Sequence, residues 1–228
     1  MAIDIETKKK LAEDWQNAFP HLSLYSRNKL YKVVGPIVIG LELIKLPYDD
    51  EYRPHFVAYP LWEKNLKECF DYPFILQEFH NDKNLQYNIP YKEAGKTLLG
   101  DVVEKINIQS PIKFNGDVSI HFLLHRLNQY AEKAPMLSNK NTLSFGHFLE
   151  AKMKIALYVN NEVANEILTK IKNHRWDGDH FKVFNIDVET WLAELSEEAK
   201  NPESFFQKIQ MNKAERKISK LKSSGIMI

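Results

Sequence analysis

Apolar and polar residues alternate in the first part of the chain with the period of two that is typical of half-buried β-strands. The alternation predicts strands over residues 29–34, 36–46 and 52–62, and a further strand over 74–79. The links between the first three are short and carry glycine, proline or aspartate, so we expect an antiparallel meander. Pro54 and Pro60 predict that the third strand lies at an edge or is bent, because proline lacks a backbone N–H.

Helical spacing appears before these strands and again after Pro90. Leu11, Trp15 and Ala18 recur on one helical face, which predicts a first helix over 5–19. Beyond Pro90 the apolar residues recur with a period of 3.6, and this predicts helices over 93–106, 117–133, 145–159, 161–174, 187–199 and 202–221. Nine of the ten prolines lie at or before residue 135, as expected if helices dominate the second half.

The change of pattern predicts an α+β fold. We expect an N-terminal antiparallel sheet of about three or four strands with a packed helix, followed by a mostly helical C-terminal half. The turn-rich stretch 110–117 is the best position for a junction between a sheet-containing subdomain, 1–112, and a helical subdomain, 113–228. A single continuous domain is the alternative.

Glycine is scarce, with 8 residues where average usage of about 7% would give roughly 16. The eight are scattered, and no G-x-G-x-x-G motif is present, so the sequence does not predict a dinucleotide fold. Gly95-Lys96-Thr97 resembles the end of a phosphate-binding loop, but Pro90 stands where that loop needs its first glycine. We therefore expect no nucleotide or other cofactor.

Charge and cysteine content indicate a soluble chain. The 31 basic and 30 acidic residues leave a net charge of +1, without the basic excess that is usual in nucleic-acid-binding domains. Cys69 is the only cysteine, so no internal disulfide forms and a reducing compartment is expected. The charged N-terminus and the lack of a long apolar run predict a cytoplasmic protein without a membrane segment.

The densest polar cluster lies around an Asp-Gly turn. Its candidate metal ligands are His174, Asp177, Asp179 and His180, with His121 and His125, which share a helical face, as further partners. The alternative is an exposed turn, with structural histidines on a half-buried helix. Glu150 and Lys152 have the spacing found in metal-dependent nucleases, but they lie in a predicted helix where such nucleases need a strand.

Two regions are candidates for binding a partner. Residues 187–203 carry a net charge of −5 and residues 204–222 a net charge of +5, so two adjacent helices could complement each other or the second could dock elsewhere. The docking candidates there are Phe205, Phe206, Lys213, Arg216, Lys217 and Lys220. On the predicted edge strand they are Tyr52, Phe56, Tyr59 and Trp62, which could also be core residues.

These patterns favour a non-enzymatic, protein-binding accessory subunit of a bacterial multi-protein assembly. A defence complex or a toxin–immunity pair is the setting we expect, although no single residue indicates it. One alternative is a metal-dependent hydrolase or nuclease that uses the 174–180 cluster. The other is a nucleic-acid-binding protein that uses the basic C-terminal helix.

Overall fold

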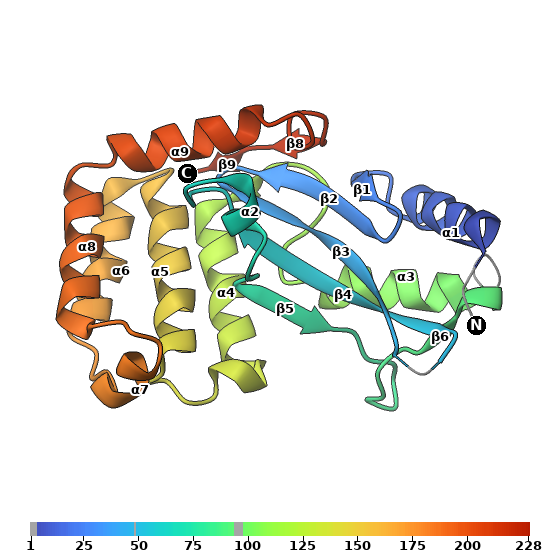
Figure 1. Cartoon of the computed structure of the whole chain (residues 1–228), viewed down its shortest axis with the longest axis horizontal. Helices are drawn as coiled ribbons and strands as arrows, with labels where there is room; N and C mark the ends of the chain where they lie inside the picture. The colour runs from blue at the N-terminus through green and yellow to red at the C-terminus, as the bar shows by residue number, and fades with distance from the viewer. Residues whose placement is uncertain (1–3, 48, 94–97) are drawn as a thin grey trace.

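Strands β1 to β5 form an antiparallel sheet in the order in which they occur along the chain (Figure 1). The structure is a computed structural model that describes residues 4–47, 49–93 and 98–228. The strands span Ser23–Ser26, Lys29–Val34, Ile37–Lys45, Glu51–Pro60 and Ile75–Glu78. Two short strands extend this sheet: β6 (Ile89–Pro90) pairs with β4, and β8 (Ser223–Ser224) pairs in parallel with β2. The predicted N-terminal antiparallel sheet is confirmed.

The prediction that the third strand of the meander lies at an edge is wrong. This strand, β4, pairs with β3 on one side and with β5 and β6 on the other. On the second side β6 pairs with Glu51 and Tyr52, and β5 pairs with residues 55–58. Pro54 therefore lies in the gap between two partners, and Pro60 lies beyond both, where a missing N–H costs no ladder hydrogen bond on that side.

Helices build most of the second half of the molecule, as predicted, and α1 precedes the sheet. The longer helices among the described residues are α1 (Ile5–Ala18), α3 (Leu98–Gln109), α4 (Ile120–Lys133), α5 (Leu143–Leu157), α6 (Asn161–Lys172), α8 (Val188–Lys200) and α9 (Glu203–Ala214). Short ones are α2 (Leu66–Cys69), α7 (Gly178–Val183) and the 3₁₀ turns η1 (Tyr91–Glu93) and η2 (Pro135–Leu137). Side-chain caps start several of them; Asn160 Oδ1, for example, accepts from the Val163 N–H at 3.2 Å.

The C-terminal segment does not follow the predicted helix to residue 221. Helix α9 ends at Ala214, and the chain continues through turns to β8 and then to β9 (Ile226–Met227), which pairs in parallel with β7 (Val118–Ser119). Ile218 and Leu221 are buried against one face of the sheet in the turn region. Their burial, together with the strand pairing that follows, outweighs continued helix. At the apolar chain end Ile226 packs partly on the core, whereas Met227 and Ile228 are exposed.

One apolar core joins the two halves of the chain. It contains Phe56 and Ile75 of the sheet, Leu127 of α4, Ile155 of α5 and Phe205 of α9. The core is thus continuous across residues 110–117, where the sequence suggested a junction. The Gly95-Lys96-Thr97 motif lies outside the described residues. Among the helices that the structure describes, none is both long enough and apolar enough to cross a bilayer.

Candidate functional site

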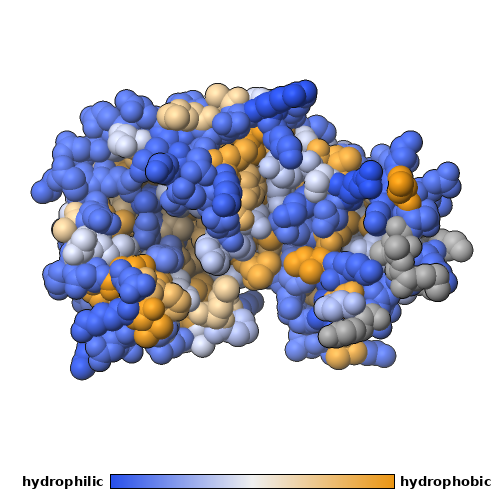
Figure 2. Space-filling view, viewed as in Figure 1, coloured by the Kyte–Doolittle hydropathy of each residue, from blue (hydrophilic) through white to orange (hydrophobic). Residues whose placement is uncertain are grey.

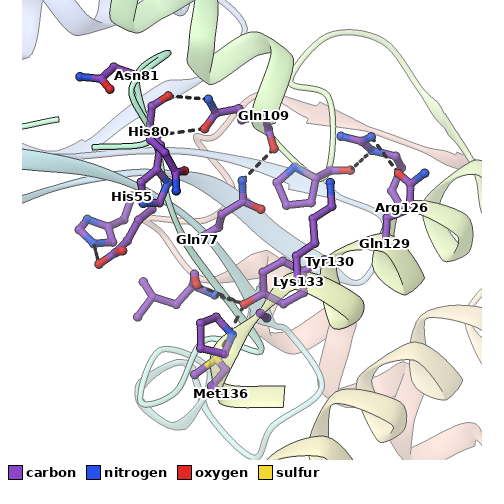
Figure 3. A pocket seen from close by; sticks show the side chains of 16 residues that line it. His55, Gln77, His80, Asn81, Gln109, Arg126, Gln129, Tyr130, Lys133 and Met136 are labelled. Carbon is purple, nitrogen blue, oxygen red and sulfur yellow. Dashed lines mark hydrogen bonds and ion pairs between the residues drawn. The ribbon is translucent and has the colours of Figure 1, made fainter. Parts of the chain in front are cut away.

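A groove opens where the helical half meets the sheet, between strand β5 and helix α4. It appears as the notch at the lower edge of the molecule in Figure 2 and is drawn from close by in Figure 3. Its volume is about 800 Å³, and its walls come from β5 and residues 79–84, the end of α3, α4 and η2. We call it the β5–α4 groove. This volume lies in the range of clefts that hold ligands in proteins.

One wall of the groove is the free edge of the sheet, and side chains hold this edge at two points. The Tyr130 hydroxyl accepts from the Leu76 N–H at 3.2 Å and donates to the Leu76 carbonyl at 3.1 Å. The Gln109 amide makes the same pair of bonds to His80, accepting from its N–H at 3.0 Å and donating to its carbonyl at 2.7 Å (Figure 3). Each side chain thus replaces the main chain of a neighbouring strand.

Glu78 lies midway between these two points. Successive residues of a strand alternate the side to which their N–H and C=O groups point. Because the main chains of Leu76 and His80 both bond on the α3 and α4 side, alternation places the N–H and C=O of Glu78 on that side too. The groove therefore runs along a strand edge on which the main chain of Glu78 lies between the residues that Tyr130 and Gln109 contact.

Burial supports the Tyr130 contact. The Tyr130 side chain is 6% exposed, and burial raises the pKa of its hydroxyl above the usual tyrosine value. The hydroxyl accordingly keeps its proton and serves as donor and acceptor at once. Tyr130 also lies 3.7 Å from the Met136 sulfur, which joins the edge to η2.

Amides, cations, imidazoles and the Glu78 carboxylate make up the other polar groups of the groove. Gln77 Nε2 donates to the Gln109 carbonyl at 2.8 Å. Arg126 donates through Nε to the Pro111 carbonyl at 3.2 Å and through Nη1 to Gln129 Oε1 at 3.0 Å. These bonds fix the orientation of the lining, which is suited to hydrogen bonding with polar groups of a ligand.

His55 lies at the opposite end of the groove and links two strands. Its side chain is almost fully buried, with Nδ1 3.3 Å from the Arg53 carbonyl oxygen and Nε2 3.7 Å from Glu78 Oε1. Glu78 also accepts a hydrogen bond from the Gln86 amide. Both ring nitrogens thus face an oxygen of the same sheet, and the imidazole ties β4 to β5.

Apolar side chains complete the lining. Leu76 is 39% exposed and Met136 is 51% exposed, and both line the groove. Exposed apolar side chains beside polar, hydrogen-bonding groups are typical of surfaces that bind a protein segment. The groove therefore offers apolar, amide and cationic contacts along one strand edge, with the Glu78 carboxylate as the one acidic side chain among its described lining residues.

The aromatic residues predicted as a docking surface on the third strand are not at the surface. Tyr52 and Phe56 are fully buried, and Tyr59 and Trp62 are at most 5% exposed. Tyr52 accepts from the Trp15 indole N–H at 2.9 Å in the core. Apolar clusters cover both faces of the sheet here: Tyr52, Phe56 and Trp62 pack in the larger cluster and Tyr59 packs in the smaller one. These four side chains therefore stabilise the fold and present no surface to a partner.

The docking candidates of the C-terminal segment divide into two groups. Phe205 is buried, Phe206 is half-buried against Tyr158, and half-buried Lys213 lies 3.2 Å from the Tyr158 hydroxyl. These residues attach α9 to its own domain. Arg216, Lys217 and Lys220 are exposed in the turns after α9 and line a second, smaller hollow.

The candidate metal ligands do not come together. Across residues 4–47, 49–93 and 98–228, no group of three or more His, Cys, Asp or Glu side chains is placed to hold a metal ion. Asp177 instead caps α7, accepting from the His180 N–H at 3.1 Å, so the Asp-Gly step starts a short helix.

Among the remaining candidates of that set, His174, Asp179 and His125 make other contacts. His174 Nε2 lies 2.8 Å from the Lys140 carbonyl, and exposed Asp179 pairs with Lys182 at 3.3 Å. His121 and His125 are exposed on α4, where His125 Nε2 lies 3.0 Å from Gln129 Nε2.

Sequence reasoning missed a buried ionic cluster on α5 and α8. Lys154 Nζ lies 2.9 Å from Glu150 Oε1 and 3.0 Å from Glu198 Oε2, and Glu150 Oε2 accepts from the Trp191 indole N–H at 2.8 Å. Burial opposes charge on Glu150 and Lys154, but their attraction prevails: it lowers the pKa of Glu150 and raises the pKa of Lys154. The cluster joins α5 to α8 inside the helical half.

This cluster also separates the two residues of the nuclease-like spacing. Glu150 bonds within the ionic cluster, whereas Lys152 bonds to Asn128 of α4. Both lie on helix α5, and burial, together with nearby Lys170, lowers the pKa of Lys152 to about 8. The structure thus directs these side chains to different partners and does not bring them to one site.

The groove itself was not predicted, because its residues come from separate parts of the chain. Gln77, Gln109 and Tyr130 lie more than twenty positions apart in sequence and meet only after the sheet and helices pack. Comparisons with protein-family models, with curated proteins and with solved structures found no match to this chain.

Proposed function

We propose that this chain is a non-enzymatic, protein-binding subunit and that the β5–α4 groove holds an extended segment of its partner. The observation that carries the proposal is the strand edge along the groove, held at Leu76 and His80 with the main chain of Glu78 between them. An extended segment that lies beside a strand edge gains main-chain hydrogen bonds, and side-chain contacts then supply specificity.

The lining indicates what such a segment would carry. Leu76 and Met136 would contact an apolar side chain. The positive charges of Arg126 and Lys133 line the α4 side and favour an acidic residue nearby. We therefore expect a short extended segment that combines an apolar residue with an acidic one.

The groove is small compared with a complete protein interface. Standard interfaces bury about 800 Å² on each partner, whereas a few residues in this groove would bury less. An isolated peptide should therefore bind more weakly than the intact partner, which would contact the surrounding surface as well.

Selection from a random 12-residue peptide library, with the purified chain as bait, would test this function. We expect enriched peptides with an apolar and an acidic residue, and at least tenfold weaker binding of these peptides to a K133E/M136E variant. That variant replaces an exposed cation and an exposed apolar contact of the groove.

The matched control is K200E/M211E, which makes the same substitutions at exposed positions away from the groove. It should bind the selected peptides as the unmodified chain does. Equal binding by both variants, or the enrichment of no peptide at all, would contradict the proposed function. Copurification with the products of neighbouring genes separately tests the setting that we propose, a bacterial defence or toxin–immunity assembly.

A further inference from the structure

A second hollow lies where the C-terminal turns pass over strand β1. Its volume is about 340 Å³, and it is lined by Leu24 and Tyr25 of β1 and by Arg216, Lys217, Lys220 and Leu221 of the turns. We call it the C-terminal hollow. It is separate from the β5–α4 groove, because the two share no lining residue.

The three cations of this hollow stand on an anchored backbone. Ile218 and Leu221 are buried beside them, and the Leu221 N–H donates to the Ile218 carbonyl at 2.9 Å. The next residue, Lys222, is tied to the sheet: its N–H donates to Ser23 Oγ at 2.9 Å, and its carbonyl accepts from the Val33 N–H at 3.0 Å. The cationic side chains therefore start from fixed positions.

Like charges gather in the C-terminal hollow without an acidic partner in the structure. No ion pair among the described residues involves Arg216, Lys217 or Lys220. Residues 204–222 contain one acid, Glu215, which is exposed. Three neighbouring cations repel one another, and a polyanion bound among them would relieve this repulsion.

The single aromatic ring of the hollow is already covered. Lys217 Nζ lies 5.3 Å from the centroid of the Tyr25 ring, and Tyr25 packs on Tyr31 and Phe70 at centroid distances of 4.9 and 5.5 Å. Proteins that bind single-stranded nucleic acid need open aromatic faces on which bases stack. This hollow offers charge without such a face.

We propose that the C-terminal hollow binds the phosphate chain of a small oligophosphate, such as a nucleoside triphosphate. Guanidinium and ammonium groups together are the usual partners of phosphate oxygens. A volume of about 340 Å³ suits a small ligand. Because the contacts are electrostatic and the ring is covered, the phosphate chain and not the base sets the affinity.

Calorimetric titration of the whole chain with tripolyphosphate, ATP and a 12-nucleotide single strand of DNA tests this proposal. We expect one tripolyphosphate per chain, an affinity for ATP within about threefold of that for tripolyphosphate, and weaker binding at high salt. An R216Q/K217Q/K220Q variant should lose at least tenfold in affinity for both small ligands.

The control variant is K170Q/K172Q/R175Q, which removes two lysines and one arginine that are also exposed. It should bind tripolyphosphate as the unmodified chain does. Equal losses in both variants would mean non-specific charge attraction and would overturn the proposal. It would also be overturned if no tripolyphosphate bound, or if the DNA strand bound and tripolyphosphate failed to displace it.

Discussion

The two edges of the sheet are closed in different ways. Short strand β1 pairs with the first part of β2, and the C-terminal segment pairs with the rest of it. The Val33 N–H donates to the Lys222 carbonyl at 3.0 Å, and the Gly35 N–H donates to the Ser224 carbonyl at 3.1 Å. At β5 no strand of the described residues pairs with Leu76 on the α4 side, and the hydroxyl of Tyr130 takes the place of a main chain.

This difference determines where a groove can exist. A main chain that pairs with an edge uses its hydrogen bonds and fills the space beside it. Tyr130 and Gln109 each hydrogen-bond to the main chain of one residue at this edge, but they cover little of its length. The β5–α4 groove remains between them. An edge that side chains close is thus protected from unwanted pairing, and the segment that we propose would reach it between them.

Removing the strand that closes the first edge should have the largest effect. Truncation after Lys222 deletes the acceptors of the Gly35 and Val118 N–H groups and the bond from the Gly225 N–H to Asp117. At about 1 kcal/mol for each of these three hydrogen bonds, and with the remaining pairing of β8 and β9 lost as well, the free energy of unfolding should fall by at least about 3 kcal/mol. Urea denaturation measures this loss. Removing only Ile228, which is exposed, should change stability by less than about 0.5 kcal/mol.

Opening the second edge at both points should cost less stability but change the state of association. Tyr130→Phe combined with Gln109→Ala should lower the free energy of unfolding by about 2 kcal/mol, because polar groups of the edge lose their partners. The freed edge should then pair with that of a second chain. Sedimentation at rising concentration should show dimers of the double variant, and a purely monomeric variant would contradict the protective role of these side chains.

Tyr130→Phe alone should lower stability by about 1–2 kcal/mol. The substitution keeps the buried ring and removes both bonds to the Leu76 main chain. Hydrogen exchange at the Leu76 amide should become faster, whereas Tyr72→Phe, at an 85% exposed position, should leave stability and exchange unchanged. Unchanged exchange at Leu76 would mean that water or another group replaces the hydroxyl.

Gln109→Ala should have the smallest effect, about 0.5–1 kcal/mol. Gln109 is half-buried, so water in the groove can replace part of its bonding to His80. Exchange at the His80 amide should rise while exchange at Leu76 stays the same. If exchange rose at both amides together, the two contacts would act as one unit and the edge would not be held at two independent points.

Local patterns predicted the elements well and their neighbours poorly. The strand at 29–34 and the helix beginning at Asn161 depend on alternation and capping, which are properties of short stretches. Trp62 and Phe205 are aromatic residues of the kind that is common in docking surfaces, but both are buried. The type of a residue does not specify whether a neighbouring element covers it. The prediction of an edge at β4 was wrong because β5 and β6 divide its second side between them.

The candidate sites show the same limit. The exposed cations Arg216, Lys217 and Lys220 were found from charge alone, since an uneven charge distribution is visible in the sequence. The groove was not found from the sequence, because glutamine and tyrosine are common residues and no spacing rule joins Gln109 to Tyr130. The ionic cluster escaped for a similar reason: Glu198 is far from Lys154 in sequence, although their side chains pair at 3.0 Å.

The sequence by itself determined the class of fold, because hydrophobic periods of two and of 3.6 residues follow from the geometry of strands and helices. It also determined the charge of the C-terminal segment. The tertiary structure decided which strand is an edge, which aromatic side chains are buried and where the groove lies. These depend on contacts between distant residues, such as that of Tyr130 with Leu76, and such contacts form only when the sheet and helices pack into one core.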